Sequence, residues 1–384
     1  MRFSFKITII AVGIIFVALL GYFVWKALSE PIVPPSESSS TSSLPFAPTA
    51  PPIKEYPAEM KGAGGTVLRR ISDVPIFDYW VLKNGEDVFY FKPDGKIASA
   101  KSGPDLEVST ETISTLNRVI PNTDGTRVLV AFGSPLTPSW GVFDAQDKVW
   151  RPLPAEVKEA AWGTKTNEIV GIVQAGGLPS LATFDYTRTP VQYVTVIKDF
   201  RLTDVHFIPQ SPGTLLIAEK PSFLQNGRLW RLNLKTQELS LLVQGERGLT
   251  VGWDDTFKTL FMFFSPNQFS ILDERMGLQT PVIFTTFPSK CAAYASSSVY
   301  CFVPRELSTK ENPATIPDDY LMRKFYTVDD LYSASEDTGT EKIFTSLSET
   351  FPAIDASHVT ARAGKLYFIN RYDGFLYELS LASQ

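Results

Sequence analysis

The sequence predicts an all-β fold, a β-propeller of about seven four-stranded blades that follows one N-terminal transmembrane helix and a linker. A polar turn followed by a short apolar strand recurs along the chain with a period typical of propeller blades. Strands near the two ends of the domain also complete one blade between them. Aromatic residues, which favour pleated surfaces, make up 12% of the 384 residues, and 28 prolines punctuate the turns. The spacing leaves six or eight blades as alternatives.

The recurring unit is clearest where Asn84-Gly85-Glu86-Asp87 precedes Val88–Phe91 and where Asp124–Arg127 precedes Val128–Val130. The strands of this kind start at residues 88, 128, 169, 215, 260, 299 and 366. The spacings between these starts are 40, 41, 46, 45, 39 and 67. All but the last lie close to the roughly 40 to 50 residues of a propeller blade. An insertion after Val303 accounts for the last.

The other strands are predicted around this one. An earlier strand often ends in an aromatic residue, namely Trp80, Trp162, Phe207, Trp253 or Tyr294. Third strands are expected at 140–144, 181–185, 229–233 and 269–273. Fourth strands are expected at 149–151, 191–197, 239–243, 282–284 and 343–344.

The last repeat supplies only three strands, at 359–361, 365–370 and 375–381. A further strand at 66–71 belongs to no other blade. We expect it to pair into the last blade, because this pairing closes the ring and removes the exposed sheet edges.

Residues 7–28 are predicted to form a transmembrane helix. The run from Ile9 to Trp25 is apolar throughout, and with Ile7 and Thr8 it reaches about the 20 residues that a bilayer core requires. Arg2 and Lys6 precede it, so residues 1–6 are expected to be cytoplasmic and the rest exported. A cleaved signal peptide is the alternative, which the length of the segment disfavours.

Residues 29–62 are predicted to be a disordered linker, and residues 63–384 the propeller domain. The linker is rich in Pro and Ser, and such a segment buries too little apolar area to order itself.

The repeats resemble the TolB and WD40-like propeller group, as in Trp162–Val170 and Asn122–Val130. The layout also resembles uncharacterised bacterial proteins with an N-terminal membrane anchor and an exported propeller. The segments that carry this resemblance are Lys290-Cys291, Tyr300–Pro304 and Pro317–Tyr320. It implies the fold and no particular activity, since propellers host both enzymes and binders.

Cys291 and Cys301 are the only cysteines, and they flank a turn centred near Ser296. On a hairpin they would lie opposite each other, at a separation that suits a disulfide. An exported domain would be in an oxidising compartment. We therefore expect a disulfide rather than a reactive thiol pair or a metal site.

The sequence contains no catalytic, cofactor-binding or metal-binding motif. His206 and His358 are the only histidines, and each is predicted to be a packed or surface residue beside a first strand. Three acidic pairs are predicted to be turns or solvated loops, namely Asp254-Asp255, Asp318-Asp319 and Asp329-Asp330. No cofactor is expected. The net charge of −5 and the lack of basic clusters disfavour nucleic acid as a partner.

The face that carries the blade-to-blade connections and the loops between second and third strands is the predicted binding face, because these loops are the longer ones. The insertion at 304–326 is its most unusual segment. It offers as candidate binding residues Arg305, Asp318, Asp319, Tyr320, Arg323 and Lys324. The competing interpretation is a passive surface excursion.

The predicted function is a non-enzymatic binding or scaffolding module in an envelope assembly, with the membrane and a protein as its partners. The alternative is a propeller enzyme, or enzyme subunit, acting on envelope glycans or peptides. Clustered Asp, Glu, Arg or His at the channel mouth would favour the enzyme, and a mixed loop face without converging carboxylates would favour the binder. A sensory module is a third hypothesis, disfavoured by the few residues before Ile7.

Overall fold

The computed structural model describes residues 57–62, 65–100, 105–163, 165, 167–188, 191–202, 204–211, 213–265, 267–280, 282–295, 298–307, 315–348 and 350–381. The predicted cytoplasmic and transmembrane segments, and the linker as far as residue 56, lie outside these ranges. Within the ranges, no helix has the length and apolarity needed to cross a bilayer.

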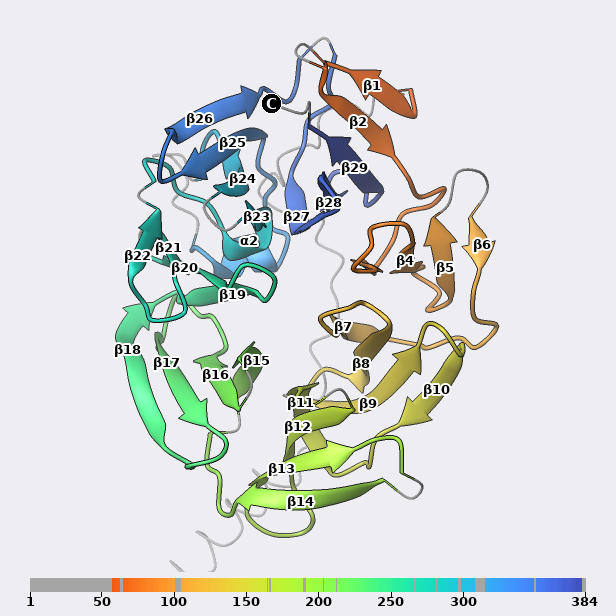
Figure 1. Cartoon of the computed structure of the whole chain (residues 1–384), viewed down its shortest axis with the longest axis vertical. Helices are drawn as coiled ribbons and strands as arrows, with labels where there is room; N and C mark the ends of the chain where they lie inside the picture. The colour runs from red at the N-terminus through yellow and green to blue at the C-terminus, as the bar shows by residue number, and fades with distance from the viewer. Residues whose placement is uncertain are drawn as a thin grey trace, which may run out of the picture. The chain divides into compact units, whose positions relative to one another are not determined.

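Seven antiparallel sheets surround a central channel, which confirms the predicted seven-bladed propeller (Figure 1). Blade 1 consists of β3 (Asp78–Val81), β4 (Val88–Phe91), β5 (Ile97–Ala100) and β6 (Leu106–Glu107). Blade 2 consists of β7 (Leu116–Pro121), β8 (Arg127–Ser134), β9 (Thr137–Asp144) and β10 (Val149–Pro152). Blade 3 consists of β11 (Val157–Trp162), β12 (Glu168–Val173), β13 (Ser180–Asp185) and β14 (Gln192–Ile197).

Blade 4 consists of β15 (Val205–Ser211), β16 (Thr214–Glu219), β17 (Asn226–Asn233) and β18 (Leu239–Arg247). Blade 5 consists of β19 (Thr250–Asp254), β20 (Thr259–Phe264), β21 (Gln268–Leu272) and β22 (Leu278–Thr280). Blade 6 consists of β23 (Cys291–Ala295), β24 (Ser298–Pro304), β25 (Asp329–Ser335) and β26 (Gly339–Phe344). The second strand of every blade contains the predicted strand start.

Blade 7 closes the ring with strands from both ends of the domain, as predicted. Its own strands are β27 (Ala356–Arg362), β28 (Lys365–Asn370) and β29 (Leu376–Ser380). The N-terminal β2 (Val67–Arg70) pairs antiparallel with β29, with Val67 opposite Ser380. The strand β1 (Glu59–Lys61), at the end of the predicted linker, pairs with β2 and makes this sheet five-stranded. Buried Met60 joins the blade core, which explains the extra strand.

The prediction that residues 282–284 form the fourth strand of blade 5 is wrong, because that strand is β22 at Leu278–Thr280. The Asp273 carboxylate accepts backbone hydrogen bonds from Arg275 and Gly277 at 2.8 and 2.7 Å, so the chain reverses directly after β21. Phe284 lies in the connection between blades 5 and 6, where its ring packs against the rings of Phe269 and Tyr332. This packing, and not a strand, accounts for the apolar residue. Ile283 beside it is 92% exposed.

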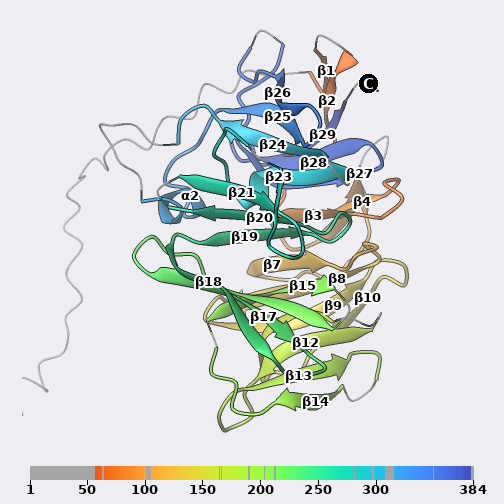
Figure 2. The same cartoon turned by 60° about the vertical axis from the view of Figure 1, so that its left-hand side comes forward.

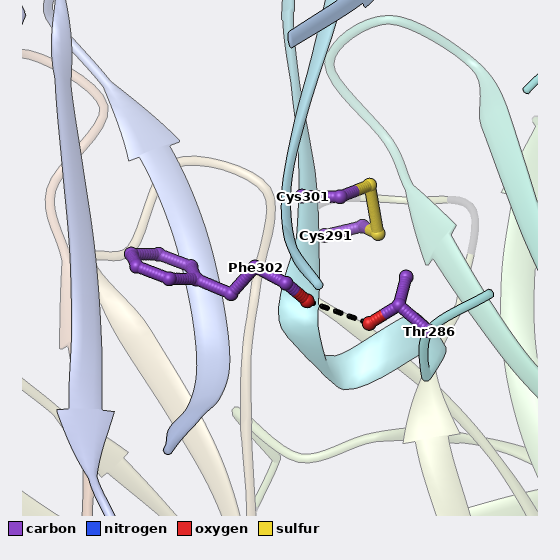
Figure 3. Close-up of a disulfide and its surroundings, with 4 residues drawn as sticks. All are labelled: Thr286, Cys291, Cys301 and Phe302. Carbon is purple, nitrogen blue, oxygen red and sulfur yellow. Dashed lines mark hydrogen bonds between the residues drawn. A yellow bond between two sulfur atoms is a disulfide. The ribbon is translucent and has the colours of Figure 1, made fainter. Parts of the chain in front are cut away.

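Neighbouring blades share hydrophobic cores, and the disulfide lies in one of them. Cys291 and Cys301 are directly opposite each other on β23 and β24 and form the predicted disulfide, with their Cα atoms 4.2 Å apart (Figure 3). Both pack with residues of blade 5, whereas Phe302 points the other way into the core shared with blade 7. This alternation is the period-two pattern of a strand buried on both faces.

The two faces of the propeller differ. The insertion face carries the blade-to-blade connections and the loops between second and third strands, including the helix α2 (Asp318–Leu321). Figure 2 shows α2 at one edge of the blades. The turn face carries the tight turns between first and second strands and between third and fourth strands.

Contacts between turns cross the channel at the turn face. The hydroxyl of Thr123 in blade 2 donates to Asp255 in blade 5 at 2.7 Å. Arg362 in blade 7 donates to the hydroxyl of Thr256 in blade 5 at 3.0 Å. Since these blades are not neighbours in the ring, the contacts link turns across that end of the channel.

Candidate functional site

The insertion between β24 and β25 is packed against the insertion face. Asp318 of α2 accepts a backbone hydrogen bond from Phe223 in a loop of blade 4, at 2.7 Å. Gly248, between blades 4 and 5, adopts a positive φ of 65°, and a Cβ there would lie 2.7 Å from the Cδ of Pro317. The described part of the insertion therefore reaches from blade 6 across blade 5 to blade 4.

Tyr320, one of the predicted binding residues, is buried and anchors the insertion. Its ring stacks on Phe287 with centroids 4.2 Å apart. The guanidinium of Arg371, which follows β28 of blade 7, lies 3.9 Å from the centroid of the Tyr320 ring. Its hydroxyl donates to Asp355 at 3.1 Å. Tyr320 is only 3% exposed, so it holds the insertion in place and offers no contact surface.

Beneath Tyr320 lies a buried network of charges from blades 6 and 7. The ammonium group of Lys290 contacts Asp329 and donates to Asp355 at 2.7 Å and to the hydroxyl of Thr327 at 3.1 Å. Arg371 donates to the second oxygen of Asp355 at 3.1 Å. The two cations balance the two carboxylates, which is the condition under which charges tolerate burial.

Burial and pairing act in opposite directions on these groups. Burial raises the pKa of Asp329 to about 6, because loss of water outweighs the attraction of Lys290. For Lys290, loss of water lowers the pKa, but Asp329 and Asp355 outweigh it and the pKa is raised. We infer that the lysine stays charged and that the network fixes the insertion.

The pair Asp329-Asp330 was predicted to be a turn or a solvated loop, and this is wrong. Both residues begin β25 and are buried. Asp330 accepts hydrogen bonds from Arg305 at 3.0 Å and from Lys342 at 2.9 Å. Arg305 and Lys342 belong to the same blade and offset the cost of burying the Asp330 carboxylate. Two adjacent aspartates in the sequence do not reveal these partners.

The remaining predicted residues of the insertion have separate roles. Asp319 accepts from Lys324 and Thr315, which lowers the pKa of its carboxyl group to about 2. Arg305 is committed to Asp330 and to the carbonyl of Ser346. The structure thus does not gather the six predicted residues into one site. Arg323 and Lys324 remain exposed.

His358 lies on the inner strand of blade 7 and pairs with blade 1. Its Nδ1 is 3.0 Å from the Asp78 carboxylate, and this charge raises the pKa of the imidazole despite partial desolvation. Arg323 and Arg371 act in the opposite direction. The hydroxyl of Tyr79 donates to the backbone carbonyl of His358 at 2.5 Å, which holds the local bulge of β27 in place.

A second charged cluster, which sequence reasoning missed, lies on three successive inner strands. Arg118 of β7 donates from Nη1 to Glu159 of β11 at 2.5 Å and lies 3.0 Å from Nδ1 of His206 on β15. Only His206 was singled out in the sequence. A signal was present, because each charged residue interrupts an apolar inner strand, but its meaning depends on how the blades are arranged.

These three residues line a cavity of about 480 Å³ on the insertion face. Its rim carries further charged side chains, Lys158, Asp204 and Lys220, and the loop residue Leu136. Lys220 pairs with Asp204 at 2.7 Å. In the described ranges, no group of three or more His, Cys, Asp and Glu residues could hold a metal ion.

Exposed apolar loop residues also occur on the insertion face. Among the residues that the structure describes, half of the large, exposed hydrophobic side chains lie on the fourth, outermost strands: Leu106, Val149, Tyr193, Val194, Leu239, Leu241 and Leu278. The other half, here called the apolar loop residues, are Leu136, Leu178, Leu224, Ile283, Leu321, Met322 and Leu347. All of these belong to loops of the insertion face, and the described turns of the turn face expose none.

Comparison with solved structures agrees with the fold. The β-propeller domain of Cps50 (Swd1) from Myceliophteria thermophila is similar, with a TM-score of 0.52 and 11% identity over 81% of this chain and 98% of that one. An oligogalacturonate lyase from Vibrio parahaemolyticus is similar with a TM-score of 0.57 and 11% identity, over 84% of this chain and 95% of that one. No family model and no curated protein matches the sequence. At this identity the likeness establishes the propeller fold alone.

Proposed function

We propose that the chain is a membrane-tethered, extracytoplasmic binding module that docks a protein partner on its insertion face. The distribution of the apolar loop residues carries the proposal. Exposed apolar side chains on loops occur on the insertion face and not on the described turns of the opposite face. Exposed apolar residues gathered on one surface are typical of protein–protein contact sites.

The way in which the insertion is held supports the same function. Buried Tyr320 and the hydrogen bond between Asp318 and Phe223 fix α2 beside the loop that carries Leu224. Leu321 and Met322 at the end of α2 are thereby presented on a rigid support. A rigid surface loses little conformational entropy on binding, which favours affinity.

The test is affinity capture of the full-length protein from its native membrane after crosslinking. We expect a stoichiometric protein partner with the unchanged chain, and a large loss of that partner with Leu224→Gln combined with Met322→Gln. The matched control is Leu106→Gln combined with Val194→Gln, which changes two residues on outermost strands that are also more than half exposed. No partner with the unchanged chain, or equal losses with both double variants, would exclude this docking face.

One observation favours the alternative function, an enzyme acting on envelope glycans or peptides. Arg118, Glu159 and His206 converge in a cavity at the channel mouth, and such groups serve in acid–base chemistry. A lyase is among the proteins of similar fold, so the fold accommodates catalysis. The test is a cleavage assay on envelope glycans and peptides. Activity that His206→Ala abolishes without unfolding the chain would favour the enzyme.

A further inference from the structure

We infer that the cavity between the inner strands of blades 2, 3 and 4 binds the carboxylate or phosphate group of a small organic ligand. This site lies on the same insertion face as the proposed protein-docking surface and shares Leu136 at its rim, but its charged residues take no part in that surface. Its volume of about 480 Å³ lies within the range of about 300 to 1,000 Å³ that small-molecule sites occupy.

The charge of the cavity favours an anion. Three cationic side chains line it, Arg118, Lys158 and Lys220, against two carboxylates, Glu159 and Asp204. Arg118 pairs with Glu159, and Lys220 pairs with Asp204. The excess is therefore one positive charge, carried by Lys158. Among the residues that the structure describes, no hydrogen bond or ion pair of its ammonium group is found.

Arg118 has donors to spare. Only its Nη1 takes part in the contacts with Glu159 and His206, so within the described chain its Nε and Nη2 have no partner. A guanidinium presents these donors in a fixed planar fork, which matches the two oxygens of a carboxylate or phosphate. Glu159 holds the side chain in place and orients the fork.

His206 adds a third donor. A guanidinium has no acceptor atom, so in the contact with Arg118 the Nδ1 of His206 must accept. The ring proton of the neutral imidazole then lies on Nε2, which has no partner among the described residues. Lys158, Arg118 and His206 thus each present donors without a partner among the described residues to one cavity. A ligand with an oxyanion supplies several acceptors and a compensating charge.

The test uses the full-length protein in detergent and three probes with the same sugar ring: D-glucuronate, D-glucose 6-phosphate and uncharged D-glucose. Binding is measured by calorimetry and by ligand-observed NMR at constant ionic strength. We expect one or both anionic probes to bind and glucose not to bind. The tighter of the two anions identifies whether carboxylate or phosphate is preferred. Added salt should weaken the binding, because an exposed ion pair is screened.

Lys158→Gln should weaken binding of the anion about tenfold or more, as expected for loss of one charge-assisted hydrogen bond. Lys235→Gln is the matched control, since Lys235 is an exposed lysine on the turn face, and it should leave affinity unchanged. Arg118→Lys keeps the charge beside Glu159 and removes the fork, and it should also weaken binding. Circular dichroism and thermal unfolding verify that each variant is folded.

Three results would overturn the inference: no binding of either anion at millimolar concentration, equal binding of glucose and glucuronate, or the same affinity for Lys158→Gln and Lys235→Gln. The partner-capture experiment with Leu224 and Met322 does not depend on this cavity. Failure of one proposal therefore leaves the other standing, and the two results can be read separately.

Discussion

Lys290 has no exposed surface, and its ammonium group touches two carboxylates that are equally buried. Removing one partner of such a network leaves charges without compensation in a medium of low dielectric constant. The cost is large because loss of water is no longer offset by attraction. The insertion face thus depends on a charge network whose members, Lys290, Asp329, Asp355 and Arg371, come from four separate segments of chain.

We expect Lys290→Met to lower the free energy of unfolding by about 3 to 5 kcal/mol, because it leaves Asp329 and Asp355 underpaired. The matched control is Lys342→Met. Lys342 pairs with Asp330 in the same blade but is 44% exposed, and its loss should cost about 1 kcal/mol or less. Urea unfolding at neutral pH measures both.

A rescue variant sharpens this comparison. Combining Lys290→Met with Asp329→Leu removes one lysine and one carboxylate, so the remaining pair of Arg371 and Asp355 is again balanced. Part of the lost stability should return. Equal effects of Lys290→Met and Lys342→Met would show that the network contributes no more than a surface ion pair does.

His358 should titrate with a pKa above its ordinary value of about 6.5, because Asp78 stabilises the imidazolium. A folded pKa above the unfolded one stabilises the fold fully below about pH 6.5, and the contribution is lost as pH rises through the folded pKa. The stability difference between the unchanged chain and Asp78→Asn should accordingly shrink over this window.

NMR titration of the His358 ring checks the cause directly. In Asp78→Asn the midpoint should fall, since desolvation and the charges of Arg323 and Arg371 then act alone. A midpoint for His358 that does not move on this substitution would rule out Asp78 as the source of the shift.

Among the elements, β2 determines whether the ring is closed. It supplies the fourth strand of blade 7 by pairing with β29, and Leu68 carries its apolar contact into the blade core. Without β2, the edge of β29 would present unpaired backbone groups, which promote association between chains. The closure therefore couples the start of the domain to its end.

We expect Leu68→Ala to cost about 2 to 5 kcal/mol of unfolding free energy, because Leu68 is fully buried and a cavity would remain. Leu106→Ala is the control on another short strand, β6. Leu106 is exposed, so its truncation should change stability by no more than about 0.5 kcal/mol. Denaturant unfolding monitored by tryptophan fluorescence compares them, and similar costs would argue against the closing role of β2.

At the scale of the whole molecule, the predicted transmembrane helix is open to a direct test. A chain that lacks residues 1–28 should be released from the membrane fraction, while the full chain should resist alkaline extraction. Protease added outside the cytoplasmic membrane should reach the propeller. A chain that lacks residues 29–56 is the control and should remain with the membrane, because its anchor is intact.

Two outcomes would contradict this prediction. If the chain that lacks residues 1–28 still extracts with the membrane, the propeller itself is the attachment. If the mature protein begins after Ser29, at the end of the small-x-small sequence Ala27-Leu28-Ser29, the segment is a cleaved signal peptide, which is the alternative to the transmembrane helix.

Sequence patterns alone predict a propeller of about seven blades, with six or eight as alternatives, together with the closing strand at 66–71 and the pairing of Cys291 with Cys301. These features depend on short segments: a turn residue next to an apolar run, a repeat period, and two cysteines flanking one turn. Turn preferences and the alternation of apolar residues along a strand involve only a few neighbouring residues, so the sequence alone shows them. The prediction of the fourth strand of blade 5 was wrong because it also relied on a short apolar run, and Phe284 is apolar without being part of a strand.

The interactions of the charged residues, by contrast, depend on how the blades pack against one another. Arg118, Glu159 and His206 lie on inner strands of three different blades, and their meeting depends on the arrangement of the blades around the channel. Lys290, Asp329 and Asp355 likewise come together through packing between two blades and the insertion. Coulomb energies and desolvation depend on distance and burial in space, which residues far apart in the sequence do not reveal.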